Sequence, residues 1–324
     1  MGAYLVRLIT VLYLASPCFV SGAMAAVCNP TLAPRASGPQ VADDFFSPAV
    51  SSTAYREGEG PVVYLDEAHH NFHTVEGRYA TFAELLRKDG FIVSPMRQKF
   101  SSDVLADADV LVIANALAGE NSESEADWRL PTYSAFTVSE ISAIEAWVRD
   151  GGALLLIADH MPWPGAAEDL GRAFGIQMTN SFATDGSCAD DEFLFQRSDG
   201  SLGRHSITDG KNDGERIDFV RTFTGQAFWL TRPGVPILKL RPGSVVLLPT
   251  VAWEFSSQTP RIPGDGLLQG AVLEHGEGRV AVFGEAAMFS AQVSGEERRP
   301  MGMNMPGAEQ NAQFLLNIMH WLTD

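Results

Sequence analysis

The chain has little cysteine and few basic side chains. Only 3 of its 324 residues are cysteine, and 23 lysine and arginine side chains stand against 40 aspartate and glutamate side chains, which gives a formal net charge of −17. This charge repels phosphate groups and therefore argues against nucleic acids and anionic membrane surfaces as partners. No segment after the N-terminal region is apolar over the roughly 20 residues that a membrane span needs. A small-molecule substrate or a protein partner fits this composition better.

Three common catalytic motifs are also missing. The sequence contains no Gly-x-Ser-x-Gly elbow, no phosphate-binding glycine loop and no Gly-x-Gly-x-x-Gly. These motifs position a serine nucleophile, nucleotide phosphates and a dinucleotide, respectively. Serine-hydrolase, kinase and dinucleotide-binding functions therefore lose their usual sequence support.

The N-terminus has the pattern of a secretory signal peptide. One positive charge at Arg7 precedes the apolar run 8–15, and small residues then lead to Ala23-Met24-Ala25. This order predicts cleavage after Ala25. The apolar run is too short for a membrane anchor. We expect residues 1–25 to be removed and the mature protein to be periplasmic or extracellular.

Two cysteines follow the predicted cleavage point, Cys28 and Cys188. In an oxidising compartment such a pair can form a disulfide. The sequence leaves both the bridged and the free state open.

Beyond residue 58 the chain alternates between apolar runs and amphipathic segments. Residues 26–58 are rich in proline, serine, alanine and glycine and predict an extended lead-in. Capping boxes at Thr81–Glu84 and Thr137–Glu140 predict two helix starts, and an amphipathic pattern over 314–322 predicts a closing helix. Apolar runs predict buried strands at 61–65, 91–93, 108–114, 153–158 and 278–284.

The order of these elements predicts the fold class. Strands without polar alternation are typical of parallel sheets that helices cover on both sides. Their alternation with helices predicts a doubly wound α/β sheet with right-handed crossovers. Residues 179–270 interrupt this order and are rich in aspartate, glycine and proline, so we expect a β-rich insertion within one domain that spans residues 59–324.

Three predicted strands end in chemically reactive side chains. The first strand runs into residues 66–73, which include Asp66, Glu67 and three histidines. The fourth runs into Asp159 and His160, and the late strand into Glu285. Because the carboxyl ends of parallel strands meet at one edge of a sheet, we expect these loops to converge.

Imidazoles and carboxylates grouped in this way suit a divalent metal ion. Zinc is favoured by the histidines, and calcium stays possible because the chain is acidic. A metal-bound water has a pKa near about 7 and is a hydroxide nucleophile at neutral pH. The predicted ligands are His69, His70, His73 and His160. The predicted proton-handling or further ligand groups are Asp66, Glu67, Asp159 and Glu285, with Asp66 also a candidate for orienting a histidine.

The same residues resemble a glutamine-amidotransferase-like family, whose members are mostly domains of unknown function. The resemblance rests on residues 65–69, Phe136-Thr137, 151–160 and Gly284-Glu285-Ala286, and it covers about residues 60–178 and 270–324. It implies a flavodoxin-like three-layer α/β/α sandwich. Class I amidotransferases have a nucleophilic cysteine after the strand that ends here at Ala158, where this chain has Asp159-His160-Met161. Cysteine-based glutaminase chemistry is therefore not expected.

Two functions from different classes remain. The first is an exported metal-dependent hydrolase of a small ester, lactone or amide. The second is a non-catalytic binding module that recognises a glycan or an envelope protein, using a side lobe that contains Trp229 and Trp253. A structural subunit of an envelope assembly is a third possibility, and the oligomeric state stays open.

Overall fold

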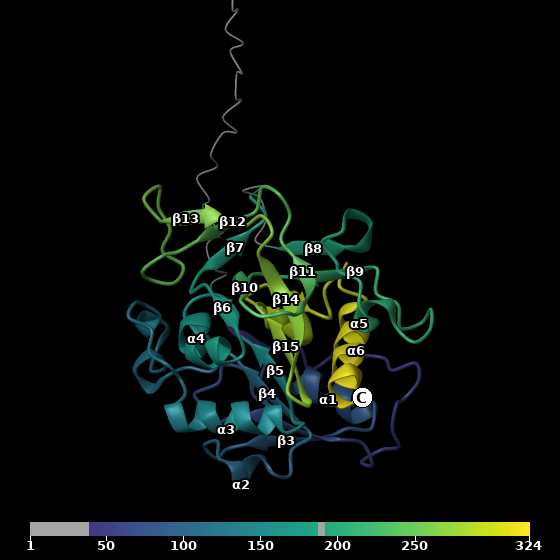
Figure 1. Cartoon of the computed structure of the whole chain (residues 1–324). Helices are drawn as coiled ribbons and strands as arrows, with labels where there is room; N and C mark the ends of the chain where they lie inside the picture. Colours follow the sequence, from purple (N-terminus) through teal and green to yellow (C-terminus); the bar gives the residue numbers. More distant parts are fainter. Residues whose placement is uncertain (1–38, 187–191) are drawn as a thin grey trace, which may run out of the picture.

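The computed structural model describes residues 39–186 and 192–324. They form a mixed α/β fold with one large sheet and several smaller sheets (Figure 1). The predicted signal peptide, Cys28 and Cys188 lie outside the described residues. Within the described ranges, every helix is too short or too polar to cross a membrane.

Five parallel strands form one side of the large sheet, with β3 (Ile92–Met96) at its edge. All five were predicted from apolar runs, because residues that are buried on both faces leave no polar positions. Parallel pairing brings the carboxyl ends of these strands to one edge. In spatial order the strands are β3 (Ile92–Met96), β2 (Val62–Asp66), β4 (Val110–Ala114), β5 (Ala153–Ile157) and β15 (Gly278–Phe283).

Antiparallel strands extend the sheet beyond β15. They are β14 (Leu268–His275), β10 (Phe228–Leu230) and β6 (Ile176–Met178), with β11 (Val235–Lys239) also paired to β14. The segment predicted as an insertion, 179–270, therefore contributes β10 and β11 to the large sheet. It also forms two small sheets, one of β7 (Phe182–Thr184), β12 (Val245–Leu247) and β13 (Arg261–Pro263), and one of β8 (Phe193–Gln196) and β9 (Phe219–Thr222). Figure 1 shows β7, β12 and β13 together at the top of that view.

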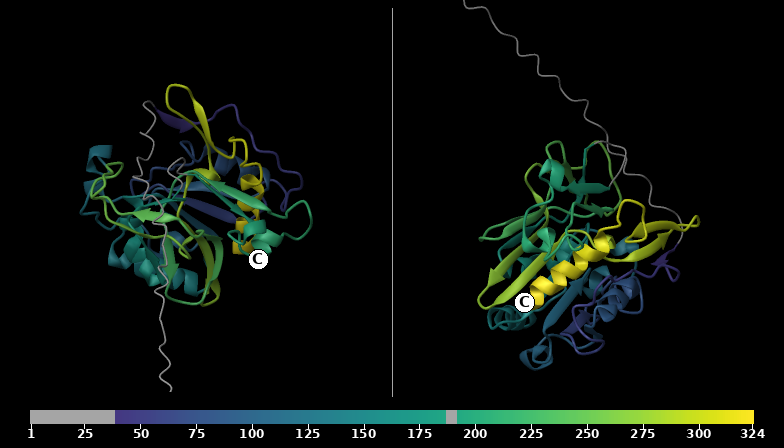
Figure 2. Two further views of the ribbon diagram at one scale, coloured as in Figure 1. Left: turned by 90° about the horizontal axis from the view of Figure 1, so that it is seen from above. Right: turned by 90° about the vertical axis from the view of Figure 1, so that its right-hand side faces the viewer.

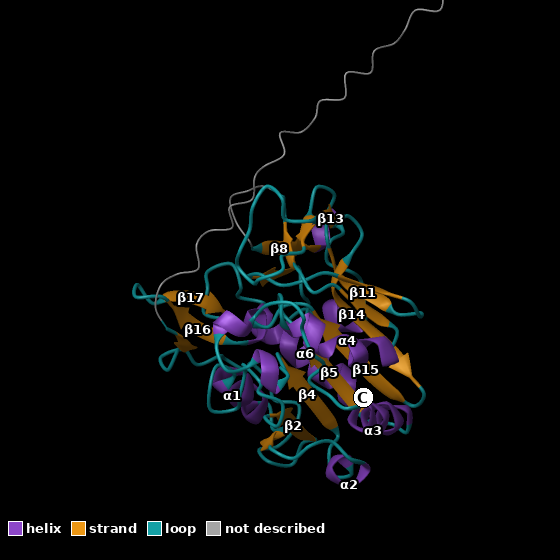
Figure 3. Cartoon of the chain, turned by 90° about the vertical axis from the view of Figure 1, so that its left-hand side faces the viewer, coloured by secondary structure: helices purple, strands orange, loops and turns teal. Residues whose placement is uncertain are grey.

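Helices cover both faces of the sheet (Figure 3). Helices α1 (Ala80–Lys88) and α6 (Asn311–Thr323) belong to one hydrophobic core, and α3 (Val138–Arg149) and α4 (Trp163–Ala173) belong to the other. Successive residues of β5 alternate between these cores: Leu155 packs in the first and Leu156 in the second. This double burial explains why the strand has no polar alternation. The short helices α2 (Ser102–Leu105) and α5 (Ser206–Asp209) lie in connecting loops.

One predicted capping box is confirmed and the other is wrong. The Thr137 hydroxyl accepts a hydrogen bond from the Glu140 N–H at 3.3 Å, and the Glu140 carboxylate accepts one from the Thr137 N–H at 2.9 Å. Helix α1 instead begins at Ala80, without a side-chain cap. Thr81 is buried inside its first turn, so its hydroxyl does not cap the helix, and Glu84 pairs with Lys88 at 2.8 Å.

Part of the predicted extended lead-in is a strand. β1 (Gln40–Ala42) pairs with β16 (Ala291–Ser294), which forms a hairpin with β17 (Arg299–Gly302). Figure 2 shows this purple N-terminal strand beside the yellow hairpin. The pairing ties the start of the described chain to the loop that follows β15.

Candidate functional site

The carboxyl ends of four neighbouring strands hold buried polar side chains. Asp66 ends β2, Asn115 follows β4, Asp159 lies just beyond β5 and Glu285 just beyond β15. Asp159 is 7% exposed, whereas the other three are fully buried. Parallel pairing of the strands therefore brings their polar ends to one edge of the sheet, and Asn115 is an additional member that the sequence analysis missed.

Asp159 and Glu285 form a pair of buried carboxyl groups at the ends of neighbouring strands. The Asp159 carboxyl accepts hydrogen bonds from the His160 N–H at 2.7 Å and from the Ala286 N–H at 3.3 Å. The Glu285 carboxyl accepts from the backbone N–H groups of Ala287 and Met288 at 2.7 and 2.8 Å. Both side chains are thus held in fixed positions by the loops that follow their strands.

Burial raises the pKa of both carboxyl groups. It raises the pKa of Asp159 to about 7, although hydrogen bonds from the His160 and Ala286 N–H groups and the nearby Asn115 side chain oppose the rise. It raises the pKa of Glu285 well above its ordinary value, and the nearby charge of Asp159 raises it further. Two neighbouring buried carboxyls do not both ionise readily. The raised pKa values favour the protonated form of both groups, and Asp159 is poised to exchange a proton near neutral pH.

Tyr79 and His73 lie beside this pair. The Tyr79 hydroxyl donates to the Ala286 carbonyl at 3.0 Å. Burial raises the pKa of Tyr79 well above its usual value, and the charges of Glu285 and Asp159 add to this effect. The ring of His73 lies 4.4 Å from that of Tyr79, measured between centroids. Tyr79 was not predicted, and no pattern in the sequence marks it.

His73 is a buried neutral imidazole. His73 is 2% exposed, and neither of its ring nitrogens has a hydrogen-bond partner among the described residues. Burial, and then the charge of Arg78, lowers the pKa of His73 well below its usual value. The ring is therefore uncharged at neutral pH, with one N–H donor and one acceptor.

His69 is held between two carboxylates. Its Nδ1 lies 2.8 Å from Asp66 Oδ1, and its Nε2 lies 2.9 Å from Glu140 Oε1. Its ring also stacks on Phe100 with a centroid distance of 4.7 Å. Burial alone would raise the pKa of Glu140, but hydrogen bonds from Thr137 and His69 lower it to about 2. Both nitrogens of His69 are engaged, so neither lone pair faces a metal position.

The other predicted residues lie in separate surroundings. His70 is exposed at the surface, with a left-handed backbone angle φ of 47°. The Nδ1 of His160 donates to the Met161 carbonyl at 2.7 Å. Glu67 accepts a hydrogen bond from the Val75 N–H at 2.8 Å and pairs with Arg97 at 3.1 Å. Glu67 thus fixes the local loop and does not face the Asp159–Glu285 pair.

The four predicted histidine ligands are not brought together. Among residues 39–186 and 192–324, no group of three or more histidine, cysteine, aspartate or glutamate side chains is placed to hold a metal ion. A divalent metal, whether zinc or calcium, stays a prediction from the sequence.

An aromatic cluster surrounds His160. The centroid of the His160 ring lies 4.5 Å from the ring centroid of Phe182, 4.6 Å from that of Trp163 and 4.7 Å from that of Trp253. Trp128 packs on Trp163 at 4.9 Å. In the described part of the chain, the indole N–H groups of Trp163 and Trp253 have no hydrogen-bond partner. The cluster packs beside the Asp159 loop and joins four separate stretches of the sequence, including the starts of α4 and β7.

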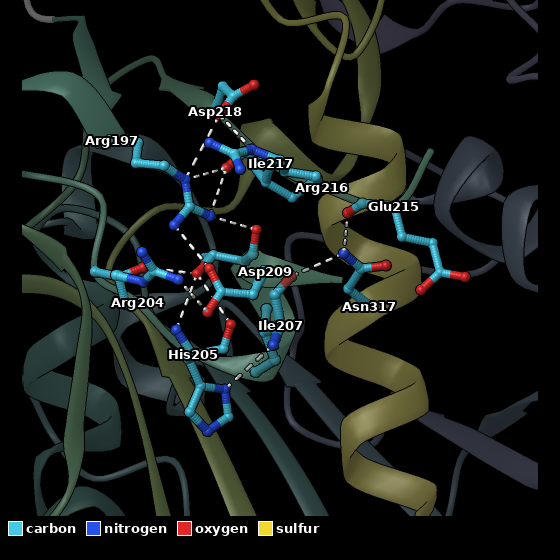
Figure 4. Close-up of polar contacts among 12 residues, drawn as sticks. Arg197, Arg204, His205, Ile207, Asp209, Glu215, Arg216, Ile217, Asp218 and Asn317 are labelled. Atoms are coloured by element: carbon cyan, nitrogen blue, oxygen red, sulfur yellow. Dashed lines mark hydrogen bonds and ion pairs between the residues drawn. The ribbon is translucent and has the colours of Figure 1, made fainter. Parts of the chain in front are cut away.

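A second polar cluster, which we call the Arg197 cluster, surrounds α5 and reaches α6 through Asn317 (Figure 4). The Arg197 guanidinium pairs with Asp209 at 2.8 Å and donates to the Ile217 carbonyl at 3.0 Å. Asn317 of α6 donates to the carbonyls of Ile207 and Glu215 at 2.8 and 2.7 Å. These contacts join the loop around α5 to the closing helix.

A surface hollow of about 610 Å³ lies at the opposite edge of the sheet. It is bordered by residues at or just before the starts of strands, including Pro61, Gly152 and Gly278, and by the end of α6. Its wall includes Trp147 and Arg279. The hollow is therefore separate from the Asp159–Glu285 pair.

No protein-family model and no curated protein matches the sequence. Among solved structures, the chain is similar to the mmIFT52 N-terminal domain, with a TM-score of 0.54 and 13% identity over 81% of this chain and 97% of that one. A ThuA-like protein from Bacteroides uniformis has a TM-score of 0.43 and 12% identity over 84% of this chain and 95% of that one. A cytoplasmic protein from Salmonella typhimurium LT2 has a TM-score of 0.46 and 12% identity over 81% and 99%.

At these identities the first similarity shows a shared fold and nothing about activity. The other two are too loose to support an argument. The resemblance to the glutamine-amidotransferase-like family therefore holds here at the level of an α/β fold.

Proposed function

We propose that the chain is a hydrolase of a small, neutral ester, lactone or amide, in which the Asp159–Glu285 pair carries out proton transfer. The observation that supports this most is the pair of buried carboxyl groups with raised pKa values at the carboxyl edge of the sheet. Strongly perturbed pKa values are concentrated at functional sites, because acid–base catalysis needs groups that exchange protons near neutral pH.

Asp159 is the general base in this proposal. Its carboxylate takes a proton from a water molecule while the water oxygen forms a bond to the carbonyl carbon, and the C=O electron pair moves onto the carbonyl oxygen. When the C=O bond forms again, the bond to the leaving oxygen or nitrogen breaks, and that atom takes the proton from Asp159. A pKa of about 7 suits a group that both accepts and returns a proton at neutral pH.

Glu285 and Tyr79 set the environment of the base. The raised pKa of Glu285 favours its neutral form, which adds no second negative charge beside the oxygen that becomes negative during the reaction. Tyr79 is fixed by its hydrogen bond to the Ala286 carbonyl. A net charge of −17 further disfavours anionic substrates, which is why the proposal names neutral ones.

We assign no step of this reaction to a metal ion. The four histidines that the sequence predicted as ligands are not grouped around one position in the described chain, because His69 has both nitrogens engaged and His70 is exposed at the surface whereas His73 is buried. The proposal includes export to the periplasm or beyond, which rests on the pattern of residues 1–25.

We also infer a flavodoxin-like three-layer architecture for the core. If the five parallel strands are numbered along the chain, their order across the sheet is 2-1-3-4-5. Flavodoxin-like sheets have this strand order. Helices on both faces support the same classification.

Hydrolysis assays on the purified protein test the proposal. p-Nitrophenyl acetate, γ-butyrolactone and a simple amide would be offered with and without a chelator, to the native chain and to D159N. We expect hydrolysis that D159N abolishes. Native activity that D159N retains would contradict the role of the pair. Activity that the chelator removes while the protein stays folded would favour the metal-dependent mechanism instead.

A non-catalytic binding module is the second candidate, and the aromatic cluster favours it. The indole N–H groups of Trp163 and Trp253 are hydrogen-bond donors without partners in the described chain, and aromatic rings are common contact surfaces for sugars and proteins. Glycan binding that W253A removes, in a chain without hydrolytic activity, would favour this function.

A further inference from the structure

Asn115 is held in an unusual backbone conformation at the centre of the site. It has a left-handed angle φ of 51° directly after β4 and is fully buried. Its N–H donates to the Ile157 carbonyl and its carbonyl accepts from the Phe72 N–H, both at 3.0 Å. Left-handed backbone is tolerated best by glycine, asparagine and aspartate, and strained residues are concentrated at functional sites.

Only one of the two polar atoms of the Asn115 side-chain amide has a hydrogen-bond partner in the described chain. Its Oδ1 accepts a hydrogen bond from the Asp159 N–H at 2.9 Å. That contact fixes the orientation of the amide, because a backbone N–H requires an acceptor opposite it. The Nδ2 then has no acceptor in hydrogen-bond geometry among the described residues, although the side chain is close enough to Asp159 to lower the pKa of that carboxyl. A buried donor without an acceptor costs about 1–3 kcal/mol, so its persistence points to a ligand.

His73 supplies a second group of the same kind. Its peptide follows Phe72, which is hydrogen-bonded to Asn115, and its ring packs on Tyr79 beside the carboxyl pair. Neither of its nitrogens has a partner in the described chain. Asn115 thus contacts Asp159 directly, and His73 lies against Tyr79, whose hydroxyl donates to the Ala286 carbonyl next to Glu285.

We propose that Asn115 is the oxygen-binding residue of this site. Its Nδ2 donates a hydrogen bond to the carbonyl oxygen of the neutral substrate, and the N–H of His73 donates a second. Donors placed in advance at an oxygen that gains negative charge stabilise the transition state. This inference rests on the proposed function for the identity of the substrate, but binding through the carbonyl oxygen does not require hydrolysis.

Binding of δ-valerolactam, an unreactive neutral carbonyl compound, tests the inference. Its dissociation constant would be measured by NMR for the native chain and for N115D. Aspartate keeps an acceptor for the Asp159 N–H and tolerates the left-handed backbone, but it removes the Nδ2 donor. We expect binding to be about 3- to 10-fold weaker in N115D, which is the effect of one hydrogen bond. N115G, which tolerates the backbone without adding a charge, should show a loss of the same size.

Asn180 provides the matched control. Its Oδ1 also has no partner in the described chain, but its Nδ2 donates to Thr132. N180D should bind the lactam like the native chain. Lactam binding that is absent from the native chain, or unchanged in both Asn115 variants while they remain folded by circular dichroism, would overturn the inference.

Hydrolysis assays separate this inference from the proposed function. Lactam binding that depends on Asn115, without hydrolysis of any ester, lactone or amide, would leave the binding role in place and remove the hydrolase. Hydrolysis with an unchanged KM and kcat in N115D and N115G would support the hydrolase and overturn the role of Asn115.

Discussion

The Asp159–Glu285 site and the Arg197 cluster are both rich in polar side chains, but they differ in how those groups are paired. In the Arg197 cluster, opposite charges meet: the guanidinium of Arg197, 14% exposed, contacts the carboxylate of Asp209. At the site, two carboxyl groups are buried together without a cationic partner among the contacts described above, and the nearby Asn115 and His73 have donors without partners in the described chain.

This difference separates a structural role from a functional one. Paired charges and satisfied hydrogen bonds lower the energy of the fold and leave nothing for a ligand. Like charges and unpaired donors raise it, so they persist where they serve binding or catalysis. Substitutions in the first cluster should therefore change stability, and substitutions in the second should change activity.

The largest effect is expected from removing the base. D159N should lower the rate of hydrolysis by about 10²- to 10⁴-fold, which is the usual contribution of a general base. The rate per folded molecule would be measured on the best substrate of the panel. D209N, the same substitution in the Arg197 cluster, is the control and should keep the native rate. Equal losses in both variants would break the distinction between the two regions.

The next effect concerns the dependence of stability on pH. The pKa of Asp159 is about 7 in the folded chain, against about 3.9 in an unfolded one, so the folded state binds more protons between these values. The free energy of unfolding should therefore fall as the pH rises from about 4 to about 7, by on the order of a few kcal/mol.

Urea unfolding at several pH values would measure this fall, and D159N should flatten it. Glu140 acts in the opposite direction, because its folded pKa is about 2. Its contribution is present above about pH 4.5 and is lost as the pH falls toward 2. A D159N chain with the native slope between pH 4 and 7 would show that Asp159 does not hold the raised pKa.

A smaller effect is expected in the Arg197 cluster. R197M should lower the free energy of unfolding by about 2 kcal/mol, because Asp209 and the Ile217 carbonyl lose their partner. The loss is smaller than for a fully buried pair, since Asp209 is partly exposed. Denaturant midpoints give the stability, and hydrolysis of the folded variant should stay native. Lost activity in a folded R197M would contradict the assignment of this cluster to structure alone.

The smallest effect concerns the border of the site. T137A should destabilise the chain by about 1 kcal/mol, the usual value of an N-cap side chain. Thr137 also holds Glu140, which contacts His69, so a modest change in activity should accompany the loss. S101A removes the cap of α2 and is the matched control, with a loss in stability alone.

Much of the core was predictable from local patterns. Val110–Ala114 and Ala153–Ile157 are apolar throughout, and both are buried strands. The rule that polar residues follow the carboxyl ends of strands placed Asp66, Asp159 and Glu285 at one edge. The same rule applied to Asn115 would have found it, since Asn115 follows the strand predicted with the least ambiguity.

The partners of these residues were not predictable. His69 lies beside Glu140, which is 71 positions away and was assigned to a helix cap, so the histidine that looked like a metal ligand is engaged by carboxylates instead. Thr81 matched a capping motif but is buried. In both cases a long-range contact decided the role of the side chain, and local spacing does not contain that information.

The titration of Asp159 and Glu285, followed by carbon-13 NMR of labelled side-chain carboxyls, tests the central claim most directly. We predict that Asp159 titrates with a midpoint near 7, that the midpoint of Glu285 is raised well above its ordinary value, and that E285Q shifts the Asp159 midpoint. A midpoint for both groups near about 4, the ordinary value of an exposed carboxyl, would contradict a buried pair with raised pKa values.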